Sequence, residues 1–264
     1  MMTFDEFNKH WSGLSDKNRK KRLIRGFYIF KKIADKQLDN FEIFIKKEGL
    51  QNDFDIYYFF NVVKSFWEDS FFSISLLKKK KFYHYAIYPV RTMMEKIIKL
   101  IYFTKNEAKR KEIIKKELLL ACVTNYKMSV LNGESGDKFR LQYDELNLQK
   151  EYCPIYEVKI EQLRAFPNYE TLCRGAVSIL MGGEEGDGDR LYNIYRYLSG
   201  LPHGNIISIK MKDHKNDKKF TRDFLLMMRF CEETIKLMDY HMERKFTKEV
   251  NDAIKKVEKI IFSP

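Results

Sequence analysis

Residues 18–48, NRKKRLIRGFYIFKKIADKQLDNFEIFIKKE, set the pattern on which the predicted fold depends. Their apolar side chains recur every three or four residues, at Leu23, Phe27, Phe30, Ile33, Leu38, Phe41 and Ile45. Because a helical turn takes 3.6 residues, this spacing places them along one face of an α-helix. The stretch contains one glycine and no proline. We therefore expect one long amphipathic helix here.

The same periodicity extends over most of the 264 residues. Glycine and proline, 12 and 5 residues, are used at roughly half their average frequency, and a sandwich or barrel would need more turns. Further helices are predicted over 55–78, 82–104, 107–131, 157–165, 169–181, 190–201, 220–244 and 247–262. Residues 132–155 are predicted as a loop, and 205–211 (NIISIKM) alternate as an extended segment would. The sequence thus predicts an all-α, multi-helix bundle, as one domain in preference to two.

The charge balance is strongly basic. Lys and Arg number 49 against 37 Asp and Glu, which gives a net charge of +12. A surface of this kind favours polyanions, either nucleic acid or an anionic membrane face. The run Lys78, Lys79, Lys80 and Lys81 is the candidate nucleic-acid-binding segment. The alternative is a lysine-rich composition whose charges only solvate helix faces.

Metal and cofactor signals are missing from the sequence. The four cysteines are scattered without a C-x-x-C pair, so neither a zinc knuckle nor a disulfide framework is predicted. The histidines form no H-E-x-x-H, and no G-x-S-x-G occurs. His10 and His84 adjoin aromatic residues, while His214 and His241 lie among charged residues typical of a surface. We expect no metal and no cofactor.

The one glycine-rich loop is GGEEGDGD at 182–189. It lacks the Lys-Ser/Thr ending of a phosphate loop, its acids would repel phosphate, and it lacks the terminal Glu of a calcium loop. We interpret it as a solvated connection, with Asp189 as the N-cap of the next helix. The chain begins without an apolar signal-peptide core, and its apolar stretches are far shorter than the ~20 residues of a membrane helix. A cytoplasmic protein without membrane contact is expected.

The segment 192–205, YNIYRYLSGLPHGN, carries the strongest chemical signal. In a helix, Tyr192, Arg196, Ser199 and His203 would share one face. Arginine can grip a phosphate with two parallel hydrogen bonds, and histidine can move a proton near neutral pH. Pro202 places His203 just past a kink or helix end. The alternative is a helix end where Arg196 and His203 only bond carbonyls and carboxylates.

A second polar pair lies on an otherwise apolar helix. Arg91 and Glu95 stand four residues apart beside the stripe of Ile87, Met94 and Ile98, so partial burial is expected. A partly buried ion pair is either a structural tie or part of a site, and we favour the tie.

Arg196, six intervening residues and His203 resemble the R-x(4–6)-H motif of the HEPN superfamily, the higher-eukaryote and prokaryote nucleotide-binding helical domains. The wider pattern is similar to an uncharacterised bacterial branch often linked to that group. That branch has a helix like Ala86…Arg91…Glu95 and, about a hundred residues later, a Tyr-Arg-x-Leu-Ser-x-x-x-His-Gly segment like Tyr195–Gly204. The resemblance spans about residues 55–245.

This resemblance implies a helical extension over residues 1–50 and an HEPN-like domain over 51–264. It implies a homodimer that sets two Arg–His pairs across a shared cleft. Many members resemble metal-independent ribonucleases of toxin–antitoxin or antiphage systems. Carried over, Arg196 would hold the scissile phosphate, and His203 would assist attack by the ribose 2′-hydroxyl. Tyr192, Ser199, Arg91 and Glu95 would support them.

Two hypotheses follow from the sequence. The first is a dimeric endoribonuclease acting on RNA, with a cognate antitoxin or defence-system protein as a further partner. The second is a non-catalytic helical module that binds a partner protein or nucleic acid through its basic surface. A nucleotide-binding regulatory domain ranks third.

Overall fold

The computed structural model describes residues 15–47, 54–79, 85–86, 88–182, 188–200 and 217–262. Within these ranges the chain forms nine α-helices and no strand, which confirms the predicted all-α, multi-helix bundle. The helices are α2 (Asp16–Lys47), α3 (Phe54–Lys78), α4 (Tyr88–Lys105), α5 (Arg110–Leu131), α6 (Asp137–Leu146), α7 (Tyr169–Met181), α8 (Gly188–Gly200), α10 (Asp217–His241) and α11 (Thr247–Phe262). The extended segment predicted at 205–211 lies outside the described residues.

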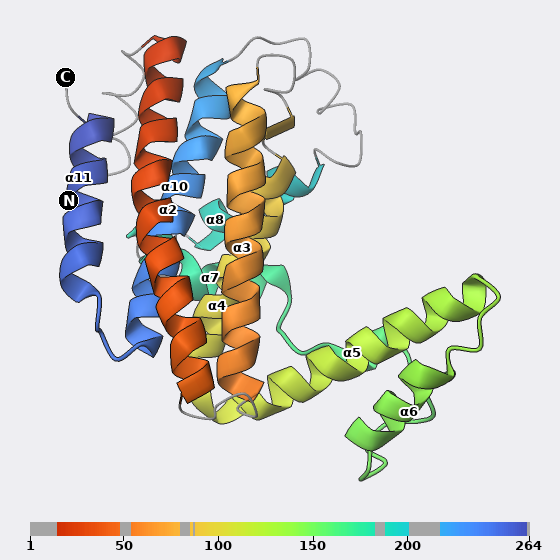
Figure 1. Cartoon of the computed structure of the whole chain (residues 1–264). Coiled ribbons are helices and arrows are strands. Elements are labelled where there is room, and N and C mark those ends of the chain that lie inside the picture. Colours follow the sequence, from red (N-terminus) through yellow and green to blue (C-terminus); the bar gives the residue numbers. More distant parts are fainter. Residues whose placement is uncertain are drawn as a thin grey trace.

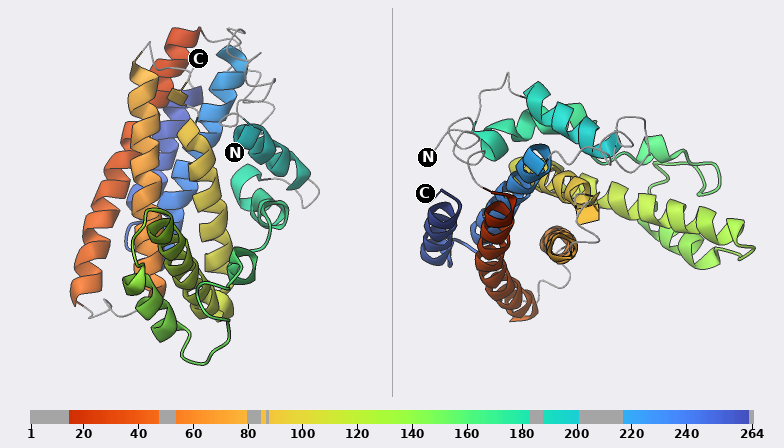
Figure 2. Two further views of the ribbon diagram at one scale, coloured as in Figure 1. Left: turned by 90° about the vertical axis from the view of Figure 1, so that its right-hand side faces the viewer. Right: turned by 90° about the horizontal axis from the view of Figure 1, so that it is seen from above.

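The main bundle has three layers. Helices α2 and α3 run side by side in the front layer of Figure 1, and α10 and α4 lie behind them. Helices α7 and α8 form the back layer, against α4, as the view from above in Figure 2 shows. Helix α11 flanks α2 and α10 at the edge. This arrangement puts α8 and α3 on opposite sides of the bundle.

One hydrophobic core unites these layers. Long apolar side chains from every helix of the main bundle meet in it, and those at its centre are inaccessible to solvent, including Phe27, Phe66, Met93, Ile97, Cys173 and Phe230. At about 25 cal/mol for each Å² of apolar surface removed from water, this burial is the main stabilising contribution. Helix α2 contributes from Leu23 to Ile45, so the sequence's first predicted helix packs within this same core.

Helices α5 and α6 form an arm that extends away from the bundle (Figure 1). The arm has its own small core of Leu119, Cys122, Val123, Tyr143, Ile155, Val158 and Leu163. The prediction of a loop over 132–155 was wrong, because α6 occupies 137–146 of it. Its apolar residues Phe139, Tyr143 and Leu146 follow the helical spacing, but only Tyr143 is fully buried. Gly133 and Gly136, at φ of 80° and 67°, make the turn that precedes it.

One predicted helix and one predicted helix cap also differ from the sequence predictions. The helix predicted at 157–165 is a 3₁₀ turn at Ile160–Leu163. Helix α8 starts at Gly188, so Asp189 lies in its first turn instead of capping it, and its carboxylate accepts a hydrogen bond from Arg174 at 3.1 Å. None of the described helices is long and apolar enough to cross a membrane.

Candidate functional site

The Arg91–Glu95 pair lies on the rim of the buried face of α4. Pro89 occupies the first turn of this helix, where its missing N–H costs nothing. Arg91 Nε donates to Glu95 Oε1 at 2.9 Å, and the two side chains are 26% and 22% exposed. Their neighbours Val90 and Met94 are buried. The expected partly buried ion pair is therefore present.

Helix α8 meets this pair through Tyr195. The Tyr195 hydroxyl donates to the same Glu95 oxygen, Oε1, at 3.3 Å. The ring of Tyr195 stacks on Tyr169 of α7, with ring centroids 4.4 Å apart and planes at 25°. The ring of Tyr192 also lies nearly parallel to that of Tyr195, with ring centroids 6.2 Å apart and planes at 15°. Glu95 thus joins three helices through one carboxylate and a column of tyrosine rings.

The surroundings hold these tyrosines in their neutral form. Burial is the main reason that the pKa of Tyr195 is raised, and the Glu95 carboxylate adds to it. Burial and Glu95 raise the pKa of Tyr169 in the same way. A phenol that stays protonated at neutral pH can donate a hydrogen bond but cannot take up a proton. Tyr195 therefore orients Glu95 as a hydrogen-bond donor and does not itself act as a base.

Arg91 stays charged in this setting. Partial burial by itself would lower its pKa, but the Glu95 carboxylate and its hydrogen bond raise it overall. The cluster therefore holds a cation, a carboxylate and a phenol in one hydrogen-bonded group. These hydrogen bonds hold α8 against α4. The Arg91 side chain remains partly exposed at the edge of the contact between the two helices.

The predicted site residues of α8 differ in how far they are exposed to solvent. Tyr192 and Ser199 are half-buried beside Tyr195, whereas Arg196 is exposed on the outer side of the helix. The Ser199 hydroxyl is shielded from solvent and has no hydrogen bond of standard geometry to any described residue. The Ser199 hydroxyl lies near enough to Tyr195 to lower the pKa of that tyrosine, but burial has a larger effect and raises this pKa overall. His203 lies outside the described residues.

Sequence reasoning missed Tyr195 and Tyr169 as site residues. Tyr195 falls on the apolar stripe of α8, with Leu191 and Leu198, a pattern that by itself predicts packing in the core. Its hydroxyl was the available signal, because a buried tyrosine needs a polar partner. That partner, Glu95, is 100 residues away in the chain.

The predicted lysine run lies on the other side of the bundle. Lys78 ends α3 and Lys79 follows it, both exposed, and Lys80 and Lys81 lie outside the described residues. The Lys78 ammonium contacts the Tyr28 hydroxyl and sits 4.3 Å from the centre of its ring. Lys78 and Lys79 therefore belong to the α2–α3 layer, on the opposite side of the bundle from α8 (Figure 2).

The prediction that His241 lies among exposed charges was wrong. It ends α10, its ring lies 4.0 Å from that of Phe59, and its Nε2 is 3.2 Å from the Thr104 hydroxyl. Burial, helped by the nearby Arg110 charge, lowers its pKa to about 4. This histidine is a partly buried, neutral residue at physiological pH. His10, His84 and His214 lie outside the described residues.

In the part of the chain that the structure describes, no three His, Cys, Asp or Glu side chains gather as metal ligands. Comparison with protein-family models, curated proteins and solved structures finds no match to this chain.

Proposed function

We propose that the protein is a metal-independent endoribonuclease of HEPN type that acts as a cytoplasmic homodimer, as a toxin or antiphage-defence effector. One observation carries the proposal. The two segments that the HEPN resemblance assigns to one site meet in space, through the Tyr195 hydroxyl on Glu95. Arg196 follows Tyr195 directly and is open to solvent, where a strand of RNA can reach it.

In this mechanism each group has a separate task. The Arg196 guanidinium grips two oxygens of the scissile phosphate and stabilises the charge that grows there. His203 of one subunit takes the proton of the ribose 2′-hydroxyl. The 2′-oxygen then attacks phosphorus, the bond to the 5′-oxygen breaks, and a 2′,3′-cyclic phosphate remains. A second His203, supplied by the twofold-related copy, protonates the leaving 5′-oxygen. The Arg91–Glu95–Tyr195 cluster positions α8 and touches no substrate.

The test is cleavage of RNA by the wild type and by variants with Arg196→Ala, Arg196→Lys and His203→Ala. Loss of one positioned proton-transfer group should slow cleavage by ~10²–10⁴-fold. Arg196→Lys should rescue poorly, because an ammonium cannot make the planar two-pronged grip. Arg190→Ala is the matched control, since Arg190 is an exposed arginine on the same helix. Cleavage should continue in EDTA.

The rival is a non-catalytic module that binds a partner protein or nucleic acid. One observation favours it: Arg91, Glu95 and Tyr195 bond to one another, as a purely structural tie also would. Wild-type cleavage by the His203→Ala variant would remove the nuclease assignment. Unfolding of both alanine variants, seen as lost helical circular dichroism, would make Arg196 and His203 structural and give the rival precedence.

A further inference from the structure

Most of the net positive charge of the chain is concentrated in two neighbouring segments. Residues 17–34 contain eight Lys or Arg, residues 70–79 contain two, and neither segment contains Asp or Glu. Because the whole chain has a net charge of +12, the remaining residues are close to neutral. Helices α2 and α3 are antiparallel neighbours, so the start of α2 and the end of α3 share one end of the bundle (Figure 1).

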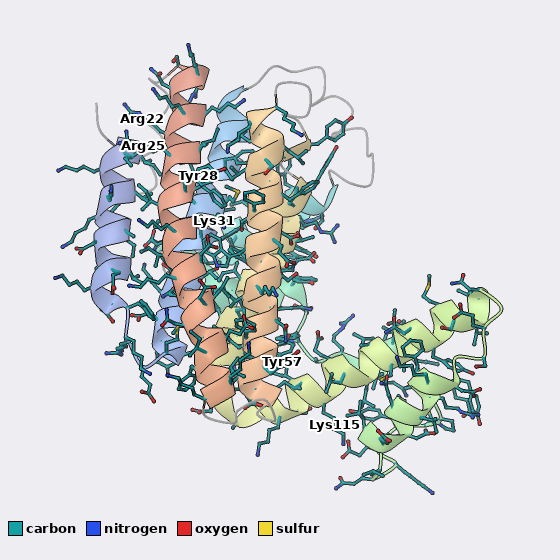
Figure 3. All side chains as sticks on the ribbon, viewed as in Figure 1. Arg22, Arg25, Tyr28, Lys31, Tyr57 and Lys115 are labelled. Carbon is teal, nitrogen blue, oxygen red and sulfur yellow. The ribbon has the colours of Figure 1, made fainter. Side chains whose placement is uncertain are left out.

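Exposed aromatic rings alternate with these cations. Tyr28 is 38% exposed and Phe71 45% exposed. Two contacts between cations and rings bridge the helices: Lys78 of α3 lies 4.3 Å from the Tyr28 ring centre, and Lys31 of α2 lies 5.6 Å from that of Phe71. Figure 3 shows Arg25, Tyr28 and Lys31 following one another along α2. We call this surface, made of Lys21, Arg25, Tyr28, Lys31, Lys32, Phe71 and Lys78, the α2–α3 face.

Three cations of the α2–α3 face are available to a ligand. Lys21, Arg25 and Lys32 are exposed and form no ion pair with any residue that the structure describes. At 1.5 Å per residue they extend over roughly 16 Å of α2. Lys31 differs, since it pairs with Asp35 at 2.6 Å. A row of unpaired cations beside exposed rings matches a ligand with repeated negative charges and flat apolar groups.

We infer that the α2–α3 face binds single-stranded nucleic acid. Its cations contact successive phosphates, and Tyr28 and Phe71 stack with bases. A duplex would hide the faces of its bases from these rings. An anionic membrane fits less well, because a helix lying on a membrane inserts an apolar face. The apolar face of α2, with Leu23, Phe27 and Phe30, is buried in the core instead.

This binding surface does not depend on the proposed nuclease activity. It lies in the front layer of the bundle, whereas α8 lies in the back layer (Figure 2). If the protein is a ribonuclease, the face holds a part of the strand away from the scissile phosphate. Changes to the face should then raise KM and leave kcat unchanged.

The test is fluorescence anisotropy of the full chain with a labelled 2′-O-methyl oligouridylate of about twelve nucleotides. Its blocked 2′ positions prevent cleavage, so binding is measured whether or not the protein is a nuclease. In Tyr28→Leu/Phe71→Leu, which keeps apolar volume but removes both rings, Kd should rise at least ~10-fold. In Lys21→Gln/Arg25→Gln, the slope of log K against log salt should fall in magnitude by about 1.4.

Matched controls lie at the other end of the same helices. Tyr57, exposed on α3, and Lys46 and Lys47, exposed at the end of α2, support the variants Tyr57→Leu and Lys46→Gln/Lys47→Gln, which should bind as the wild type does. Equal helical circular dichroism confirms folding. The inference is overturned if the oligonucleotide does not bind, or if removal of both rings leaves Kd unchanged. It is also overturned if only phosphatidylserine vesicles bind. An oligothymidylate of the same length shows whether RNA is preferred to DNA.

Discussion

At the scale of single residues, Glu95 is the junction of the candidate site. Its Oε1 accepts from Arg91 and from Tyr195, and so links the partly buried cation of α4 to the tyrosine column of α7 and α8. Arg196 follows Tyr195 in the chain, and its side chain is exposed to solvent, where a ligand can contact it. In this arrangement Glu95 and Tyr195 position α8, and Arg196 is the exposed residue to which we assign phosphate binding in the proposed function.

His241 should make stability depend on pH. Its pKa is about 4 in the folded chain against 6.5 as the ordinary value, so the unfolded chain binds more protons between these limits. The free energy of unfolding should therefore fall as pH drops from 6.5 towards 4, by up to about 3 kcal/mol from this residue. Urea unfolding at pH 7 and pH 4 measures the decrease.

The comparison variant is His241→Gln, whose amide can still bond the Thr104 hydroxyl but does not titrate. Carboxylates, including the buried Glu233 with its raised pKa, titrate in both proteins and cancel in the comparison. The decrease should be clearly smaller in the variant. Equal decreases in the two proteins would mean that His241 does not control this dependence.

At the scale of helices, the close approach of α7 and α8 determines where the site lies. A Cβ atom on Gly188 would be 2.9 Å from the Arg174 Cα and 2.5 Å from its Cγ. Only a residue without a side chain allows α8 to start this near to α7. The contact then carries Tyr195 onto Tyr169.

Substitution Gly188→Ala should destabilise the fold by ~1–3 kcal/mol, because the backbone of α7 or α8 must shift. Gly175→Ala, on α7, is the matched control, since a Cβ there meets nothing within 4 Å. It should stabilise slightly, by ~0.5–1 kcal/mol, through better helix propensity. Thermal unfolding of the two variants measures this difference. Equal melting temperatures would mean that α7 and α8 accommodate a Cβ at position 188 without a loss of stability.

At the scale of the whole molecule, the proposed chemistry needs two copies. One Arg–His pair provides one proton-transfer group, whereas a twofold-symmetric dimer provides an acid and a base from one sequence. Helix α8 lies in an outer layer of the bundle, where a second copy can reach it (Figure 2).

Light scattering should give a mass twice the 31.8 kDa of one chain. A charge at exposed Asn193 of α8, in Asn193→Glu, should weaken the dimer, because α8 carries Arg196 and the proposed dimer sets the two Arg–His pairs across a shared cleft. Asn125→Glu, the same change at an exposed position of α5, should leave the mass unchanged. A fully active monomer at micromolar concentration would contradict the dimeric mechanism.

The sequence by itself determined the fold class and most helices. The predicted limits of 169–181 and 247–262 coincide with those of α7 and α11. The apolar periodicity that predicts a helix depends only on the residues of that helix. The Arg91–Glu95 pair was equally readable, since an i, i+4 contact needs only the helix that carries it. Helix α6 was obscured by the glycines and proline around it, although its apolar residues have helical spacing.

Only the tertiary structure decided which faces meet. Periodicity shows that Tyr195 belongs to a buried stripe, but not that its hydroxyl ends on a carboxylate 100 residues away. Likewise, the charged neighbours of His241 in the chain gave no sign that it would pack against Phe59. Such contacts depend on how three or more helices pack together, and packing is a property of complementary surfaces that no single helix contains.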